Sequence, residues 1–222
     1  LCVGLDPRFD LIPGDPADFL RQVIEETIPF TAAYKPNSAY FEQLGSAGFR
    51  LLESVLGMIP ADIPVILDAK RSDIGETQKA YAQAAFGHFG ADAVTLNASL
   101  GYDTIEPFLD FPGRAVYLLA VTSNPGAAEF ALQKLGDGRH VFEHTLDMAA
   151  RAAVAGGQPL HRLAAAQQRA DDVGGQDALP ARHAHFIEPH LLLQHAGVVD
   201  QRRQRPQRQL GLGEQALHVE FV

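Results

Sequence analysis

The sequence of 222 residues has little of several features that would mark a particular class of protein. Its one cysteine, Cys2, excludes a framework of disulfides and a zinc site built from cysteines. Its 18 Lys and Arg against 27 Asp and Glu give a net charge of -9, which argues against a general nucleic-acid binder. No apolar run reaches the roughly 18 residues of a membrane helix, and the first residues lack the basic and then apolar pattern by which a signal peptide is predicted. We therefore expect a soluble, cytoplasmic globular protein that binds neither membranes nor nucleic acids.

Lysine is absent from residues 151–222, although this part holds 10 of the 15 glutamines and 6 of the 9 histidines. Residues 1–150 carry 20 acidic and 10 basic side chains, whereas residues 151–222 carry 7 and 8. Because two parts of one domain rarely differ so much, we predict a catalytic part over residues 1–155 and an atypical tail over residues 156–222. The tail is either a polar extension or small appended domain, or the product of a frameshift between residues 152 and 158. A GC-rich gene read in a wrong frame gives this composition.

Residues 1–155 alternate between apolar runs and segments with helical spacing. Strands are expected over residues 1–5, 30–34, 64–67, 93–96 and 115–121, and helices over residues 15–27, 37–56, 73–89, 104–109 and 141–154. Repeated βα units mean parallel strands, which form either an α/β barrel or a doubly wound sheet. No strand is followed by a G-x-G-x-x-G turn, which disfavours a dinucleotide-binding sheet. The pattern stops after five units, three short of a complete TIM barrel.

Charged residues cluster directly after the third expected strand, in the order Asp68-Ala-Lys70-Arg-Ser-Asp73. Alternate side chains of a strand share a face, so Asp68 and Lys70 point into one site, and Lys35 ends the neighbouring strand. The carboxyl ends of the strands are where a TIM barrel builds its active site. Two ammonium and two carboxylate groups placed together keep one another ionised.

This arrangement of charges suits a decarboxylation. Loss of CO2 from a substrate carboxylate beside Asp68 removes one of two neighbouring anions, and a protonated lysine can then stabilise and protonate the carbanion. The same spacing also fits a salt-bridge cluster on the surface. It fits a metal site less well, because Lys70 between two carboxylates repels a cation. The spacing by itself leaves these alternatives open.

Four segments resemble, in the same order, the motifs of the orotidine 5'-phosphate decarboxylase family. They are Gly4-Leu-Asp6-Pro, Lys35-Pro-Asn-Ser-Ala-Tyr-Phe-Glu42, Leu67-Asp-Ala-Lys-Arg-Ser-Asp-Ile-Gly-Glu-Thr77 and Val121-Thr-Ser-Asn-Pro-Gly126. The second and fourth are similar to the bacterial type 2 branch, and the resemblance runs from residue 1 to about residue 155. It implies a TIM (β/α)8 barrel with five recognisable units and three absent or corrupted ones. The implied reaction converts orotidine 5'-phosphate to UMP and CO2 in de novo pyrimidine synthesis.

The resemblance also implies a role for each matching residue. Lys70 is implied as the proton donor to C6 of the pyrimidine, Asp68 as the group that faces the substrate carboxylate, and Lys35 as a bridge from Asp68 to the ribose hydroxyls. Asp73 is implied to complete the network from the other subunit of a homodimer. The remaining substrate contacts are Thr77 beside Asp73, Asp6 at a ribose hydroxyl and Ser123 at the pyrimidine edge. Neither a metal nor an organic cofactor is implied.

The tail departs from the family pattern. Family members hold the substrate phosphate with a G-x-G-x-Q-G-G loop and an arginine beyond the fifth unit, and nothing after residue 155 matches these features. We therefore expect impaired activity and a chain that folds poorly or aggregates. Two alternative functions remain: a sugar-phosphate lyase or aldolase of the same barrel suprafamily, and a non-catalytic remnant that binds UMP. Such lyases usually bind magnesium and lack the K-P-N-S motif, so Lys35 argues against the first.

Overall fold

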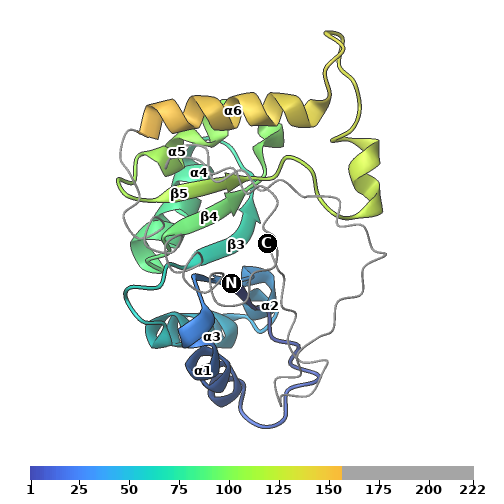
Figure 1. Ribbon diagram of the computed structural model, residues 1–222. Helices are drawn as coiled ribbons and strands as arrows, with labels where there is room; N and C mark the ends of the chain where they lie inside the picture. The colour runs from blue at the N-terminus through green and yellow to red at the C-terminus, as the bar shows by residue number, and fades with distance from the viewer. Residues whose placement is uncertain (157–222) are drawn as a thin grey trace.

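The computed structural model describes residues 1–156, in which five short strands alternate with helices (Figure 1). The strands are β1 (Cys2–Leu5), β2 (Ala33–Pro36), β3 (Ile66–Arg71), β4 (Ala93–Leu96) and β5 (Ala115–Leu118). The α-helices are α1 (Pro16–Thr27), α2 (Ser38–Glu42), α3 (Ser46–Met58), α4 (Gly75–Ala82), α5 (Glu106–Leu109) and α6 (Val141–Gly156). All but the first residue of the predicted tail lies outside the described residues.

Short helical turns of other types lie between these elements. Four are 3-10 turns, η1 (Ile28–Phe30), η3 (Ala98–Leu100), η4 (Tyr102–Thr104) and η5 (Pro125–Glu129), and η2 (Gln83–His88) is a π-helical turn that prolongs α4. Helix α1 packs against α3, and α5 packs against both α4 and α6. Helix α6 runs along one end of the described part (Figure 1). No helix within residues 1–156 is long and apolar enough to cross a membrane.

The strands lie side by side in the order in which they occur in the chain. β1 pairs with β2, and β4 lies between β3 and β5, all in parallel. Parallel bridges from Tyr34 to Val65 and from Asn37 to Asp68 connect β2 to β3. A doubly wound sheet reverses its strand order at a switch point, whereas a barrel adds each strand beside the previous one. The described strands therefore form five units of a (β/α) barrel, as predicted.

Alternation of side chains gives each strand two faces. One face joins the helices in the main core, where the largest buried side chains include Leu5, Tyr34 and Leu96. The other face carries a small cluster of mainly short side chains, Ala33, Ile66, Ala93 and Ala115, with Cys2 and Tyr117 packed against it. Two positions further along three of these strands come Lys35, Asp68 and Thr95, so a polar layer lies next to the small apolar one.

The second strand begins later than predicted. The expectation of a strand over residues 30–34 is wrong at its start, because Ile28–Phe30 form η1, with Pro29 in its first turn. Thr31 closes this turn by donating a side-chain hydrogen bond to the carbonyl of Thr27 at 2.8 Å, so extended pairing starts only at Ala33. The shift brings Lys35 into the strand itself.

The single helix expected over residues 37–56 is divided into α2 and α3. Gly45 joins them with a φ of 59°, a left-handed conformation that favours glycine. Gly48 lies against the end of α2, where an added Cβ would be 1.7 Å from the carbonyl oxygen of Phe41. The two glycines therefore permit a sharp, tightly packed corner where the apolar pattern alone predicted a continuous helix.

Candidate active site

The end of β3 departs from regular strand geometry. Pairing with β4 runs from Leu67 opposite Val94 to Arg71 opposite Leu96, so four steps along β3 correspond to two along β4. Within this bulge Lys70 has a φ of 46°, the one positive φ of a non-glycine residue in the described part of the chain. Bulges redirect side chains at the ends of strands. Asp68 and Lys70 do come together, but a strained bulge rather than simple strand alternation brings Lys70 to Asp68.

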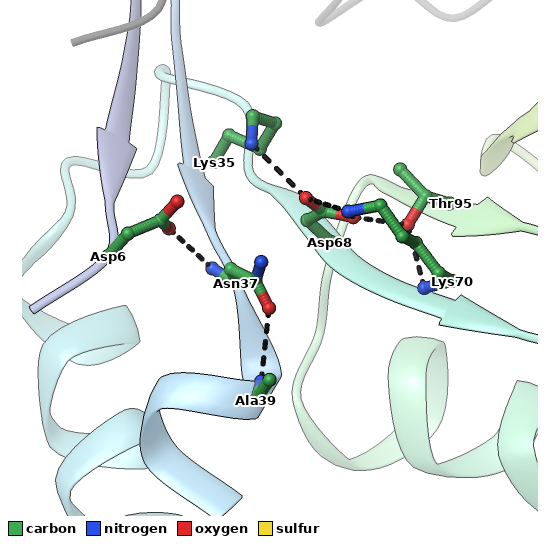
Figure 2. A network of polar contacts seen from close by, with 7 residues as sticks. All are labelled: Asp6, Lys35, Asn37, Ala39, Asp68, Lys70 and Thr95. Carbon is green, nitrogen blue, oxygen red and sulfur yellow. Dashed lines mark hydrogen bonds and ion pairs between the residues drawn. The ribbon is translucent and has the colours of Figure 1, made fainter. Parts of the chain in front are cut away.

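Asp68 lies between two lysine side chains, as Figure 2 shows. Nζ of Lys70 is 2.7 Å from each carboxylate oxygen of Asp68, and Nζ of Lys35 is 3.2 Å from Oδ2. The side chains of Asp68 and Lys35 are 6 % and 11 % exposed, whereas that of Lys70 is 47 % exposed. The site therefore presents one ammonium group to solvent and holds its carboxylate inside.

Asp68 is stabilised as an anion in spite of its burial. Burial alone would raise the pKa of Asp68, but the hydrogen bond from Lys70, the positive charge of Lys35 and a hydrogen bond from Thr95 together hold that pKa below its usual value. A negative charge is therefore fixed at the carboxyl end of β3.

Thr95, on β4, was missed by the sequence reasoning. Its hydroxyl group is 2.7 Å from Oδ1 of Asp68 and 2.9 Å from the backbone nitrogen of Lys70, and the residue is buried. Thr95 is the one polar residue of β4 and lies two positions after the inward-facing Ala93, level with Asp68. That position in an otherwise apolar strand is the signal that could have found it.

Asp6 and Asn37 connect the ends of the first two strands. Oδ1 of Asp6 accepts a hydrogen bond from the backbone N–H of Asn37 at 3.0 Å (Figure 2). The side chain of Asn37 in turn accepts from the N–H of Ala39 at 3.1 Å and caps α2. Asp6 thus lies at the same edge of the barrel as Lys35 and Asp68, on the neighbouring strand end.

Asp73, Thr77 and Ser123 are the remaining predicted site residues. Asp73 accepts the N–H of Ile74 at 2.8 Å, and no ion pair links it to Lys35 or Lys70 within residues 1–153. Thr77 is exposed on the first turns of α4, and Ser123 is exposed in the segment between β5 and η5. The structure therefore does not bring Asp73 into the charged group of its own chain.

Arg71 makes its contacts with the neighbouring helices and not with this group. It forms an ion pair with Glu42 of α2, and its guanidinium lies 4.8 Å from the centre of the Tyr81 ring on α4. These contacts connect the end of β3 to the two helices beside it.

Within residues 1–153, no three His, Cys, Asp or Glu side chains are grouped so that they could hold a metal ion.

The family model described as "Orotidine 5'-phosphate decarboxylase / HUMPS family" matches residues 1–211, well beyond the last of the four motifs. The chain belongs to this family. Among curated relatives, the orotidine 5'-phosphate decarboxylase of Herpetosiphon aurantiacus is 42 % identical over 158 residues, and that of Dehalococcoides mccartyi is 44 % identical over 152 residues. These alignments cover 68 % and 66 % of this chain, and 59 % and 56 % of the relatives. The chain thus spans less than three fifths of the length of these family members.

Solved structures of family members support the same fold. UMP synthase of Leishmania donovani matches with a TM-score of 0.64 and 40 % identity, covering 70 % of this chain and 35 % of that one. OMP decarboxylase of the same organism matches with a TM-score of 0.64 and 37 % identity, covering 74 % of this chain and 70 % of that one. The five described units therefore share the backbone arrangement of decarboxylase barrels.

Proposed function

We propose that this protein decarboxylates orotidine 5'-phosphate to UMP and CO2, the reaction of de novo pyrimidine synthesis. The observation that carries the proposal is the buried Asp68 anion held between Lys35 and Lys70. Membership of the family and the names of the curated relatives support the choice of substrate.

Asp68 supplies repulsion that the reaction relieves. Its lowered pKa keeps it ionised, so a substrate carboxylate bound beside it meets a fixed negative charge. That repulsion disappears when the carboxylate leaves as neutral CO2, which favours the transition state over the bound substrate. Lys35 holds Asp68 in place and is close enough to share a ribose hydroxyl with it.

Lys70 supplies the proton. When the bond between C6 and the carboxylate carbon breaks, its electron pair stays on C6 and CO2 departs. The ammonium group of Lys70 stabilises this carbanion, transfers a proton to C6 and is left neutral until it takes a proton from solvent. Its half-exposed side chain, anchored at both oxygens of Asp68, suits a group that must face the substrate.

We further propose a homodimer with shared active sites. Within the described residues Asp73 forms no ion pair with Lys35 or Lys70, which fits a role in the site of the partner subunit with Thr77 beside it. Asp6 and Ser123 are proposed contacts of the ribose and the pyrimidine. Independence of metals and organic cofactors, and a cytoplasmic location, stay predictions.

Reduced turnover is part of the proposal. Binding energy from the substrate phosphate, remote from the breaking bond, can lower the chemical barrier. The sequence beyond residue 155 carries no recognisable phosphate loop, so we expect a lower kcat/KM than that of the Herpetosiphon aurantiacus relative assayed in parallel.

The test is an absorbance assay with the full chain and orotidine 5'-phosphate, with and without EDTA. We expect loss of substrate absorbance that EDTA does not change and that Lys70→Ala abolishes. The matched control is Lys79→Ala, which removes an exposed lysine of α4 paired with Glu76. EDTA-sensitive turnover of another sugar phosphate would indicate the lyase alternative, and binding of UMP without turnover would indicate a remnant.

A further inference from the structure

We propose that Thr95 is a positioning residue of this site, whose hydroxyl group fixes the backbone of Lys70 and the carboxylate of Asp68 together. The inference deepens the proposed function, on which its consequence for turnover rests. Thr95 lies on β4, outside the four motifs, and no substrate contact is required of it. Its role follows from the direction of its hydrogen bonds.

The hydroxyl of Thr95 has one partner of each kind. The backbone N–H of Lys70 can only donate, so at 2.9 Å Oγ1 of Thr95 must accept from it. The single hydroxyl proton is then available for Oδ1 of Asp68, 2.7 Å away. Since an ionised carboxylate can only accept, this direction favours the charged form of Asp68.

The same hydroxyl explains how the bulge of β3 is tolerated. Lys70 adopts a left-handed φ of 46°, which non-glycine residues rarely do. Its N–H donates to the side-chain oxygen of Thr95 on β4 at 2.9 Å. Regular pairing resumes directly afterwards, with the N–H of Asn97 donating to the carbonyl of Arg71 at 2.9 Å. The threonine side chain thus replaces the backbone acceptor that the bulge removes.

Asp68 then has no freedom to turn away from a substrate anion. Oδ1 receives Lys70 and Thr95, and Oδ2 receives Lys70 and Lys35, which uses about the four acceptor positions of a carboxylate. Thr95 is the uncharged donor of this set and is 4 % exposed, so water competes little for its hydroxyl. The side chain of Lys70 therefore bonds to Asp68 directly, and its backbone N–H is connected to Asp68 through the hydroxyl of Thr95.

The first test is a titration of the Asp68 carboxyl carbon by 13C NMR in the full chain, its signal assigned with Asp68→Asn. In Thr95→Val, which keeps the shape but lacks the hydroxyl, we expect Asp68 to titrate at higher pH than in the wild type. Thr95→Ser keeps the hydroxyl and should restore the titration. Thr31→Val removes a buried hydroxyl that bonds to the carbonyl of Thr27 before the start of β2, and it should leave Asp68 unchanged.

The titration tests the inference without any need for turnover. An unchanged titration of Asp68 in folded Thr95→Val overturns it, and Thr95→Ala gives the same decision if the valine variant does not fold. In the assay with orotidine 5'-phosphate, we expect kcat of Thr95→Val to fall about 10- to 100-fold with KM little changed, and Thr95→Ser to recover it. Unchanged kcat contradicts the inference. A shifted titration in a chain without turnover rejects the proposed function and supports the positioning role.

Discussion

Lys70 combines a chemical role with an unfavourable backbone conformation. A left-handed conformation costs a residue with a Cβ about 1–2 kcal/mol, and strain of this kind persists where the surrounding structure enforces it. Here the enforcing contacts are the hydroxyl of Thr95 on the N–H and the carboxylate of Asp68 on Nζ. In this conformation Nζ of Lys70 reaches both carboxylate oxygens of Asp68.

Replacing Lys70 with glycine or alanine separates the two contributions. Both variants lose the ammonium group, but only glycine adopts the left-handed φ without cost. We expect Lys70→Gly to be more stable than Lys70→Ala by about 1 kcal/mol in urea denaturation, after allowing for the greater chain entropy of glycine. At Lys79, within α4, the order should be reversed by about 1 kcal/mol. If the alanine variant were the more stable one at both positions, the backbone of Lys70 would not be strained.

At this scale, the sequence predicted that Lys35, Asp68 and Lys70 meet, but not the backbone geometry by which they do so. All three come at the carboxyl ends of predicted strands, and that position was enough to predict their meeting. The bulge was not predictable, because it depends on a register shift between β3 and β4 and on a threonine 25 positions after Lys70. The short pattern Asp-Ala-Lys does not predict the contact between Lys70 and Thr95.

The corner between α2 and α3 shows how elements depend on single glycines. Apolar spacing predicted one helix, since periodicity reports the buried face and not the path of the axis. The turn at Gly45 and the close approach of Gly48 to Phe41 divide the predicted helix into α2 and α3. Strand β4, buried on both faces, was predicted with its observed bounds because its short, mainly apolar run is bounded by the polar residues Asp92 and Asn97.

Two glycine substitutions test this corner. Gly48→Ala places a Cβ 1.7 Å from a backbone oxygen, which no side-chain movement can relieve, so we expect a loss of about 2 kcal/mol or more in the free energy of unfolding. Gly57→Ala, in α3 with nothing within 4 Å of the added Cβ, should instead stabilise by up to about 1 kcal/mol. Equal effects of the two substitutions in denaturant unfolding would show that the corner does not need the glycine.

For the whole molecule, the central question is how a chain that spans less than three fifths of its curated relatives assembles a site. The described part supplies five strands in barrel order, with the charged group at their carboxyl ends. The fold could be predicted this far because βα repeats need only local pattern and short connections. The predicted tail and the aggregation expected from an open barrel concern residues outside that part and stay predictions.

Shared active sites give a prediction about pairs of subunits. Lys70→Ala and Asp73→Ala should each be inactive alone, whereas co-expression of the two with different tags should restore up to about a quarter of wild-type turnover. A mixed dimer contains one site with Lys70 from one subunit and Asp73 from the other. Absence of any recovery in purified mixed dimers would show that Asp73 does not act across the interface.

The central claim is that the lysine anchored on Asp68 protonates the carbon from which CO2 departs. The most direct measurement is to incubate the full chain with orotidine 5'-phosphate in D2O and to examine the product by NMR. We predict UMP with one deuterium at C6 for the wild type and no product for Lys70→Ala. UMP formed equally well by Lys70→Ala would contradict it.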